Sequence, residues 1–317
     1  MVNSINILII NNTKMTLRGN IMVNDNLEEK RKHGDFLLPL GIYEVNLGND
    51  EFSISAHWHK EIEIILIKSG EFNLQINSDF YTCKSGDIII INCEELHYLT
   101  AKKNIYSEFI SLVFDISQLN SSTLDSSSVN FITPILNKKF KLPVIIDTYC
   151  SIYNDLKEII MKIIKVYNNR YYGFELEIKA LMFSFFANIF RENLVIKKDN
   201  TLLDDSKSLK IKKVIKYIEG NYQNDINISD LSNLCHYNEY HFMRFFKKYT
   251  GKTCIQFIKN YRLEKAYILL RNTDLSITQI SFEVGFSNVS YFIRSFKEKY
   301  KVTPREFRLK FNNSFGI

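Results

Sequence analysis

The chain has 317 residues, of which 45% are hydrophobic and 14% aromatic, so it can bury substantial cores and is too apolar for a disordered protein. This length exceeds that of one typical domain and favours two. The longest apolar stretch, residues 180–190, is interrupted by Ser184 and Asn188 and is shorter than the roughly 20 apolar residues that span a bilayer. We therefore expect no membrane partner.

Cysteine usage points to a reducing compartment. The five cysteines form no CxxC pair and are odd in number, so neither a disulfide framework nor a structural zinc site is expected. The N-terminal apolar run has no basic residue before it and no small-residue cleavage site, so it does not resemble a secretory signal. A cytoplasmic location is the expectation.

Residues 36–114 are predicted to form short strands. Four apolar segments rich in Ile, Phe, Val and Tyr lie in this region: 61–67, 71–76, 88–91 and 105–114. Turn residues separate them, and such spacing is typical of an antiparallel barrel or sandwich.

Histidines and a carboxylate recur within this β-region. His57 and His59 are two residues apart and would project from one side of a strand, while Glu63 and His97 return on neighbouring strands. Three imidazoles and one carboxylate suit a divalent transition metal. The same side chains could instead hydrogen-bond an organic effector, or form a satisfied structural cluster at the barrel mouth. The sequence leaves these three interpretations open.

Residues 151–193 are predicted to form two amphipathic helices. Their apolar positions are Ile152, Leu156, Ile159, Ile160, Ile163 and Ile164 in the first helix, and Phe174, Ile178, Leu181, Met182, Phe185, Phe186, Ile189 and Phe190 in the second. Faces this broad predict self-association as a homodimer. The alternative is that the two helices pack on each other and on the barrel.

The polar segment 197–207 is predicted to be a linker, and the charge changes there. Residues 1–206 hold 21 Lys/Arg and 26 Asp/Glu, a net charge of −5, whereas residues 207–317 hold 20 and 9, a net charge of +11. A basic third joined to an acidic remainder favours a module that binds a polyanion. A basic surface that is merely solvated is the alternative.

The basic third repeats itself. Residues 241–257 (HFMRFFKKYTGKTCIQF) align with residues 291–307 (YFIRSFKEKYKVTPREF) at an offset of 50. Each copy is predicted to be a short helix, a tight turn and a second helix, with Asn238 capping the second helix of the first copy and Gly285 in the turn of the second. A longer amphipathic helix over 255–270 would hold the copies at a fixed separation.

The second helix of each copy is apolar on one face and carries Arg, Lys, Tyr, Asn and Ser on the other. Such a helix suits a DNA major groove, where Arg bonds to guanine, Asn bonds to adenine and Lys neutralises phosphates. Two units about 10 base pairs apart would read successive major-groove faces of one duplex. A plain helical bundle is the alternative.

Residues 211–310 resemble the DNA-binding domain of the AraC/XylS family of bacterial transcription regulators. The segment 277–297 (ITQISFEVGFSNVSYFIRSFK), Thr303-Pro304 and Phe307-Arg308 carry the resemblance, whereas His236-Tyr237 stand where the family often has Gly. The resemblance implies two helix-turn-helix subdomains joined by a linker helix. The DNA-contact residues that follow are Tyr240, Met243, Arg244, Lys247 and Lys248 in the first recognition helix, and Asn288, Ser290, Tyr291, Arg294 and Lys297 in the second.

The N-terminal spacing HxHx3Ex6G, followed by Gly86-Asp87 and His97, is similar to the two cupin motifs, although Asn92 and Cys93 stand where Pro is usual. The resemblance implies a small β-barrel over about residues 36–114. Cupin-like domains joined to AraC-type DNA-binding domains generally hold effectors. His57, His59, Glu63 and His97 are then the effector-binding candidates.

The predicted protein is therefore multidomain. Residues 1–196 form a cupin-like antiparallel β-barrel plus helices for effector binding and dimerisation, 197–207 form the linker, and 208–317 form an all-α double helix-turn-helix domain. We predict a cytoplasmic, sequence-specific transcription regulator that is controlled by a small-molecule effector and binds double-stranded DNA as a homodimer. RNA polymerase is a further predicted partner, and no catalysis and no obligatory cofactor are expected.

Two alternatives remain at this point. One is a cupin metalloenzyme, dioxygenase- or isomerase-like, that carries a DNA-binding domain and holds a divalent metal at His57, His59, Glu63 and His97. The other is a constitutive DNA-binding protein without an effector.

Overall fold

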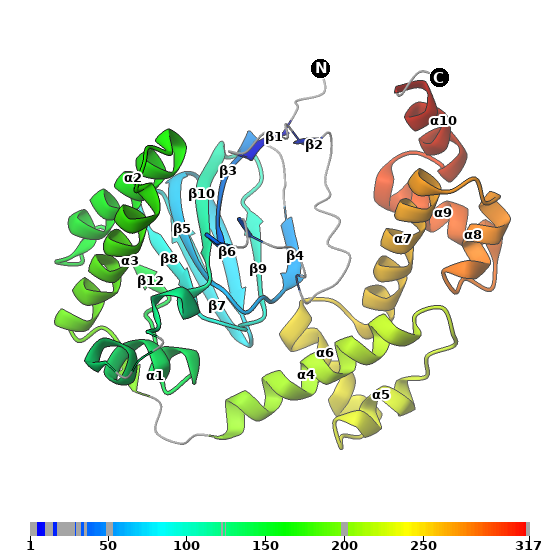
Figure 1. Ribbon diagram of the computed structural model, residues 1–317. Helices are drawn as coiled ribbons and strands as arrows, with labels where there is room; N and C mark the ends of the chain where they lie inside the picture. The colour runs from blue at the N-terminus through cyan, green and yellow to red at the C-terminus, as the bar shows by residue number, and fades with distance from the viewer. Residues whose placement is uncertain are drawn as a thin grey trace. The chain divides into compact units, whose positions relative to one another are not determined.

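A computed structural model describes residues 5–9, 15–17, 29, 33–34, 37–48, 53–121, 123, 125–197 and 202–314. The described residues fall into two compact units, one ending before and one beginning at residue 202. The first runs from blue to green in Figure 1 and the second from yellow-green to red. None of the described helices combines the length and the apolar character needed to span a bilayer.

The N-terminal unit is built on two antiparallel sheets. The larger has the strand order β12-β8-β5-β10-β3-β1-β2 and the smaller the order β4-β9-β6-β7. The strands are β1 (Ile5–Ile9), β2 (Met15–Leu17), β3 (Leu40–Gly48), β4 (Ser53–His57), β5 (Ile62–Ser69), β6 (Glu71–Ile76), β7 (Asp79–Lys84), β8 (Ile88–Ile91), β9 (His97–Ala101), β10 (Ser107–Phe114) and β12 (Ile145–Ile146); β11 (Phe140–Lys141) and β13 (Ile196–Lys197) form a separate pair.

The predicted antiparallel β-fold is confirmed, but the described strands form two separate sheets instead of one closed barrel. The chain crosses from the larger to the smaller sheet at Gly70, between β5 and β6. Its φ of +93° suits glycine, and an added Cβ would lie 2.3 Å from the Ser107 hydroxyl oxygen. Because the chain bends sharply at this corner, the hydrogen-bond ladder is not continued from one sheet to the other.

The larger sheet is apolar on both faces. All four isoleucines of β8 are buried, and they alternate between two cores. Ile88 and Ile90 pack with the helices, whereas Ile89 and Ile91 face the smaller sheet. The result is three layers: helices, larger sheet and smaller sheet (Figure 1).

Helices α2 (Tyr153–Asn169) and α3 (Phe174–Arg191) form the helical layer, together with the short α1 (Thr133–Leu136). Leu156 and Ile160 of α2, and Met182 and Phe185 of α3, are fully buried in the same cluster as the sheet residues. The apolar stripes therefore pack on each other and on the sheet, which was the alternative to self-association. These buried stripes give no support for a dimer.

The C-terminal unit is helical, as predicted. Its helices are α4 (Leu202–Asn221), α5 (Ile228–Leu234), α6 (Glu239–Thr250), α7 (Cys254–Asn272), α8 (Ile277–Glu283), α9 (Val289–Tyr300) and α10 (Pro304–Ser314). The pairs α5–α6 and α8–α9 are the two helix-turn-helix units, and α7 lies between them in the chain. Helices α4 and α10 were not predicted.

Helix α4 begins inside the predicted linker 197–207. Of that segment, residues 202–207 are helical and residues 198–201 lie outside the described residues. Buried Ile211, Ile215 and Ile218 provide the apolar stripe that anchors the helix. The C-terminal part of the predicted linker is thus helical, and the linker and domain boundaries stay a prediction.

Arg262 of α7 binds the segment between α4 and α5. Its guanidinium donates hydrogen bonds to the backbone carbonyls of Tyr222 and Asn224, both at 2.8 Å. The Tyr222 carbonyl also lies against Gly285, where an added Cβ would approach it to 2.4 Å. The end of α4, helix α7 and the second turn therefore form one packed body.

The two turns adopt similar left-handed backbones although only one contains glycine. His236 has φ +55° in the first turn and Gly285 has φ +87° in the second. A non-glycine residue pays about 1–2 kcal/mol for this conformation. The first turn therefore adopts the same left-handed backbone as the second turn without a glycine.

We expect Gly285→Ala to destabilise the C-terminal unit by more than about 1 kcal/mol, because the new Cβ would collide with the Tyr222 carbonyl. His236→Gly is the matched control in the equivalent turn and should leave stability within about 1 kcal/mol or raise it. Urea unfolding of the full chain measures both. Equal destabilisation by the two substitutions would contradict the close approach at Gly285.

Candidate ligand site and DNA interface

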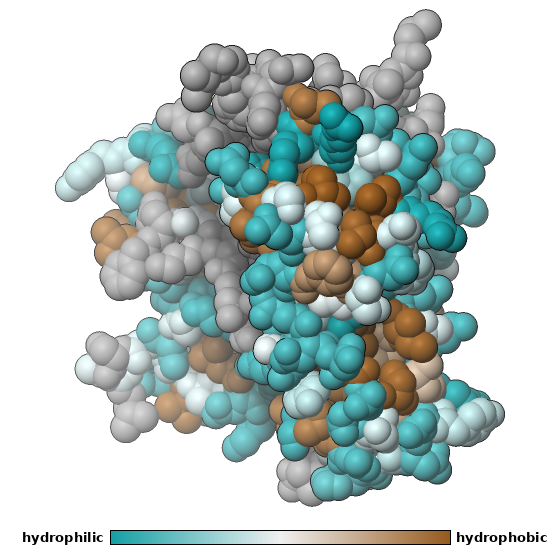
Figure 2. Space-filling view, turned by 90° about the vertical axis from the view of Figure 1, so that its right-hand side faces the viewer, coloured by the Kyte–Doolittle hydropathy of each residue, from teal (hydrophilic) through white to brown (hydrophobic). Residues whose placement is uncertain are grey.

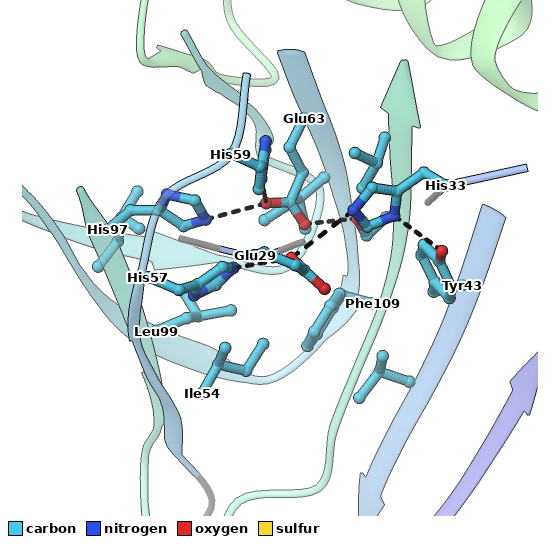
Figure 3. Close-up of a pocket in the computed structure, with 15 residues that line it drawn as sticks. Glu29, His33, Tyr43, Ile54, His57, His59, Glu63, His97, Leu99 and Phe109 are labelled. Carbon is cyan, nitrogen blue, oxygen red and sulfur yellow. Dashed lines mark hydrogen bonds and ion pairs between the residues drawn. The ribbon is translucent and has the colours of Figure 1, made fainter. Parts of the chain in front are cut away.

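The four residues predicted for the effector site come together between the two sheets (Figure 3). His57 ends β4 and His97 begins β9, and these two are cross-strand partners in the smaller sheet. Glu63 lies on β5 of the larger sheet, and all four side chains are buried. One ligand atom from each residue lies within 4.8 Å of those of the other three. The prediction placed His57 and His59 on one strand. In the structure β4 ends at His57, so His59 reaches the site from the β4–β5 connection.

The structure adds two residues that sequence reasoning missed. Glu29 donates its backbone N–H to the Trp58 carbonyl at 2.8 Å. Its Oε2 lies 3.7 Å from Nε2 of His57 and 3.7 Å from Nε2 of His33. The His33 ring is in turn hydrogen-bonded through Nδ1 to the Tyr43 hydroxyl at 2.8 Å. The only sequence signal was the spacing of four residues between Glu29 and His33.

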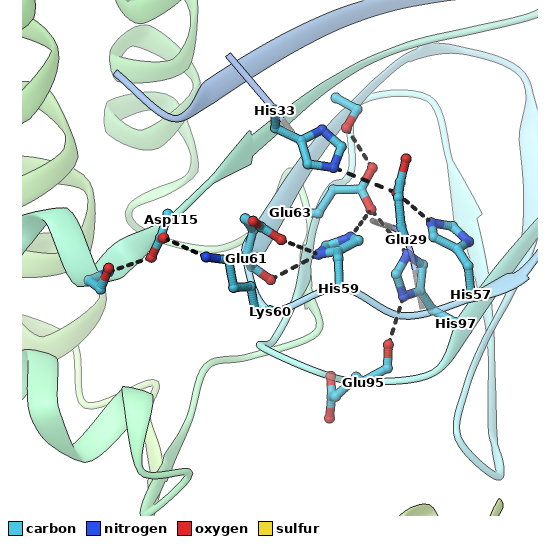
Figure 4. Close-up of polar contacts among 12 residues, drawn as sticks. Glu29, His33, His57, His59, Lys60, Glu61, Glu63, Glu95, His97 and Asp115 are labelled. Atoms are coloured by element: carbon cyan, nitrogen blue, oxygen red, sulfur yellow. Dashed lines mark hydrogen bonds and ion pairs between the residues drawn. The ribbon is translucent and has the colours of Figure 1, made fainter. Parts of the chain in front are cut away.

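Hydrogen bonds to the backbone fix the orientation of two imidazoles (Figure 4). Nδ1 of His59 lies 3.1 Å from the Glu61 carbonyl, and Nδ1 of His97 lies 2.8 Å from the Glu95 carbonyl. A carbonyl only accepts, so both Nδ1 atoms donate, and in the neutral ring the lone pair is on Nε2. Both Nε2 atoms are buried.

These Nε2 atoms face a single carboxylate oxygen. Oε2 of Glu63 lies 3.5 Å from Nε2 of His59 and 3.2 Å from Nε2 of His97. The other oxygen, Oε1, accepts a hydrogen bond from Ser111 on β10 at 2.5 Å. Ser111 therefore fixes the carboxylate so that one oxygen remains directed at the imidazoles.

Burial and mutual contacts set the ionisation of the site. Burial, with the neighbouring His97, lowers the pKa of His57 to about 3, so this imidazole is neutral at neutral pH. Burial alone would raise the pKa of Glu63, but its contacts with His59 and His97 outweigh this effect and hold that pKa well below the usual value. Burial alone would also raise the pKa of Glu29, but its contacts with His33 and His57 outweigh burial and lower that pKa. Both carboxylates are therefore ionised.

The remaining wall of the site is apolar and the free space is small. Val45, Ile54, Ile65, Leu74, Leu99 and Phe109 line it. The cavity measures about 50 Å³. Pockets for drug-sized ligands measure roughly 300–1,000 Å³. In this conformation the site can hold an ion with a few waters or a very small molecule.

The predicted DNA-contact residues lie on α6 and α9 or at the start of α9, and all except the half-buried Met243 are exposed. On the opposite faces, Phe242 and Phe246 of α6 and Phe292 and Phe296 of α9 are fully buried, as predicted. The guanidinium of Arg244 lies over the Tyr240 ring, 5.8 Å from its centroid. From the side of the C-terminal unit the surface is mainly hydrophilic, with hydrophobic side chains exposed in several separate places (Figure 2).

Comparison with known proteins decides the family. Residues 40–185 match the model of the AraC-like ligand binding domain, and residues 231–310 match that of a helix-turn-helix domain. The Transposon Tn10 TetD protein of Escherichia coli is 38% identical over 98 residues, which cover 31% of this chain and 71% of that protein. The chain belongs to the AraC family of transcriptional regulators.

Two further similarities extend over most of the chain. An uncharacterized HTH-type transcriptional regulator of Bacillus subtilis, YdeC, is 24% identical over 290 residues, covering 91% of this chain and 98% of the relative. A solved structure of ToxT from Vibrio cholerae matches with 18% identity and a TM-score of 0.42, covering 85% of this chain and 97% of ToxT. This AraC-family chain is a DNA-binding transcriptional regulator with a ligand-binding domain, which confirms the predicted function class.

Among the predicted DNA-contact residues of this AraC-family chain, Asn288 has a structural role that the prediction did not anticipate. Its Oδ1 accepts a hydrogen bond from the Tyr291 amide at 2.9 Å and so caps α9. Asn238 caps α6 in the same way, accepting from the His241 amide at 2.8 Å. The side-chain oxygen of Asn288 is therefore already engaged in the absence of DNA.

We expect Asn288→Ala to lower the stability of the first turn of α9 by about 1 kcal/mol, because the Tyr291 amide loses its acceptor. Amide hydrogen exchange at Tyr291 in the full chain measures this loss. Asn288→Asp is the control, since aspartate caps helices as well as asparagine does and should preserve protection. Unchanged exchange in the alanine variant would contradict the capping role.

Proposed function

We propose that this AraC-family regulator reads a specific operator with α6 and α9, and that a ligand held by His57, His59, Glu63 and His97 biases its DNA binding. A ligand can do this only if it interacts differently with the binding-competent and incompetent arrangements of the protein. The observation that carries the proposal is the equivalence of the two exposed recognition helices within one packed unit.

Helices α6 and α9 match each other in length, capping and the position of their arginines. Helices α6 (Glu239–Thr250) and α9 (Val289–Tyr300) have the same length, and each begins after an asparagine cap. Arg244 and Arg294 occupy the same position within them, and both are exposed. Two arginines presented alike on two helices are suited to bidentate bonds with guanines in two successive major grooves.

Exposed lysines supply the remaining affinity in this proposal. Lys247 of α6 and Lys297 of α9 lie in the last turn before the C-terminus of their helices, and both are exposed. Together with Lys248 they would neutralise phosphates, which gives salt-dependent affinity without sequence preference. The net charge of +11 on residues 207–317 favours this attraction over a longer range.

We extend the proposal to the setting of the protein. It acts in the cytoplasm, as a homodimer, and contacts RNA polymerase to activate or repress transcription. Met161 of α2 and Leu176 and Phe183 of α3 remain exposed after the helical stripes are buried, and they support a dimer formed through the outer side of the helical layer. The predicted dimer thus depends on these outer side chains.

A cupin metalloenzyme is the second candidate function. The three imidazoles and one carboxylate favour it, because they are suitable ligands for a catalytic metal. An enzyme of the dioxygenase or isomerase class must also place an organic substrate beside the metal. A cavity of about 50 Å³ leaves little space for one. We therefore propose a regulator without catalytic activity.

We expect Arg244→Ala and Arg294→Ala each to cost about 1–3 kcal/mol on the selected operator and to relax specificity at the base pair that each arginine reads. Lys247→Ala is the control and should weaken binding to all duplexes alike while reducing the salt slope by about 1. Binding of the full chain to the operator and to a random duplex measures both effects. Equal losses on the two duplexes for the arginine variants would refute direct readout.

A further inference from the structure

We propose that Glu95 is a positioning residue that joins the ligand site to β13, the last described strand before α4. The inference rests on the proposed function, because it names the residues through which a ligand would bias DNA binding. Three parts of the N-terminal unit carry it: the histidines of the ligand site, the β8–β9 connection (residues 92–96), and the segment 138–142 that contains β11.

The β8–β9 connection binds two of the ligand-site histidines through its backbone. The Glu95 carbonyl accepts a hydrogen bond from Nδ1 of His97 at 2.8 Å (Figure 4). The Glu94 amide donates to the His59 carbonyl, also at 2.8 Å. Because His59 and His97 line the cavity, a ligand that displaces either residue acts directly on this connection.

The side chain of Glu95 binds the segment 138–142. Its Oε1 lies 2.8 Å from Nζ of Lys141, and the side chains of this pair are only 12% and 21% exposed. Burial would lower the pKa of Lys141, but the contact with Glu95 outweighs burial and raises that pKa, so the lysine is charged. The loss of one partner from a buried pair leaves the other charge uncompensated. Glu95 therefore holds Lys141 firmly against the β8–β9 connection.

Asn92 attaches the same connection to the same segment a second time. Its Oδ1 accepts a hydrogen bond from the Leu142 amide at 2.8 Å, and its Nδ2 donates to the Leu142 carbonyl at 3.2 Å. Both residues are buried, so water does not compete for these bonds. The neighbours Lys141 and Leu142 are thus both fixed to the β8–β9 connection.

Two left-handed backbone positions meet across this contact. Glu94 has φ +60° and Lys138 has φ +57°. Their side chains form an ion pair at 2.7 Å. Non-glycine residues adopt this conformation rarely, and such positions concentrate in ligand clamps and switch regions, where surrounding contacts hold them. The release of one contact would let these positions relax.

Strand β11 carries the contact to β13. Lys141 is the register partner of Ile196, and Phe140 is the partner of Lys197. Only four residues separate β13 from α4 in the chain. A connection this short restricts where α4 can begin once β13 is placed. The ligand site is therefore linked to the start of the DNA-binding unit through Glu95, Lys141 and β13.

Amide hydrogen exchange of β13 in the full chain tests this link. The amide of His97→Asn lies where Nδ1 of the ring lies and keeps a donor for the Glu95 carbonyl, whereas the amide of His97→Gln lies at the place of Nε2. We expect His97→Gln to raise the exchange rate of β13 about tenfold and His97→Asn to leave it within about twofold. Equal exchange rates in the two variants would overturn the link.

The ion pair is tested by three lysine variants. Lys141→Met should raise the exchange rate of β13 about tenfold, and Lys141→Arg, which keeps the charge, should restore protection. Lys102→Met is the matched control, because it removes the same charge from an exposed pair with Glu71 and should not affect β13. Glu95→Gln keeps the shape of the side chain and makes the same test should Lys141→Met fail to fold.

A double variant shows whether the two contacts act in one series. In His97→Gln/Lys141→Met we expect a smaller effect on β13 than the sum of the two single effects, because both substitutions break the same link. Each variant is first checked for the wild-type unfolding midpoint. Fully additive effects would contradict the role of Glu95.

Operator binding distinguishes this inference from the proposed function. We expect Lys141→Met to change the operator affinity of the full chain by about fivefold or more, and Lys102→Met to leave it within about twofold. Unchanged operator affinity in Lys141→Met, together with faster exchange of β13, would overturn the regulatory role of Glu95. A chain in which β13 responds but no operator is bound would instead contradict the proposed function and leave the link standing.

Discussion

The larger sheet of the N-terminal unit must be covered on both faces, and the rest of that unit follows from this constraint. β5 is buried along six consecutive residues and β8 along its whole length. Strands that are apolar on both sides are stable only in a sheet that other layers cover on both faces. Helices α2 and α3 cover one face of this sheet, so their apolar stripes are buried within the chain. The other face takes the smaller sheet, and the polar cluster lies where the strands of both sheets begin or end, at His57, Glu63 and His97.

The helical unit was more predictable than the β-unit because its contacts are local. The Phe residues at positions i, i+3, i+4 and i+7 of α6 identified the buried face directly, and the repeat identified its counterpart in α9. Two features needed tertiary information. Helix α4 begins within the predicted linker, and its later residues Ile211, Ile215 and Ile218 are buried. His236 adopts a left-handed backbone in a turn where the family often has glycine, and the Tyr237 amide closes this turn by donating to the Ser232 carbonyl at 3.0 Å.

The candidate sites were predictable only in part, for a physical reason in each case. His57, His59 and Glu63 are close in the chain, and pairing of β4 with β9 brings in His97, so a spacing pattern could find them. Glu29 and His33 precede β3 and belong to no motif. They reach the site through a backbone bond to Trp58 and a side-chain bond to Tyr43. Asn288 was predicted only as a DNA contact, although asparagine is favoured both as a helix cap and as an adenine contact.

The buried carboxylates are the feature that a purely structural interpretation explains least well. Removing an ionised group from water costs several kcal/mol, and apolar side chains of similar volume commonly give equal or greater stability. Glu63 offsets this cost with the Ser111 hydroxyl on Oε1 and with contacts of Oε2 to His59 and His97, at 3.5 and 3.2 Å. Glu29 adds a second negative charge beside His57, a ring that burial keeps neutral. The side chains thus gather imidazoles and carboxylates around one small volume. The polarity of this volume constrains the proposed ligand as much as the small size of the cavity does.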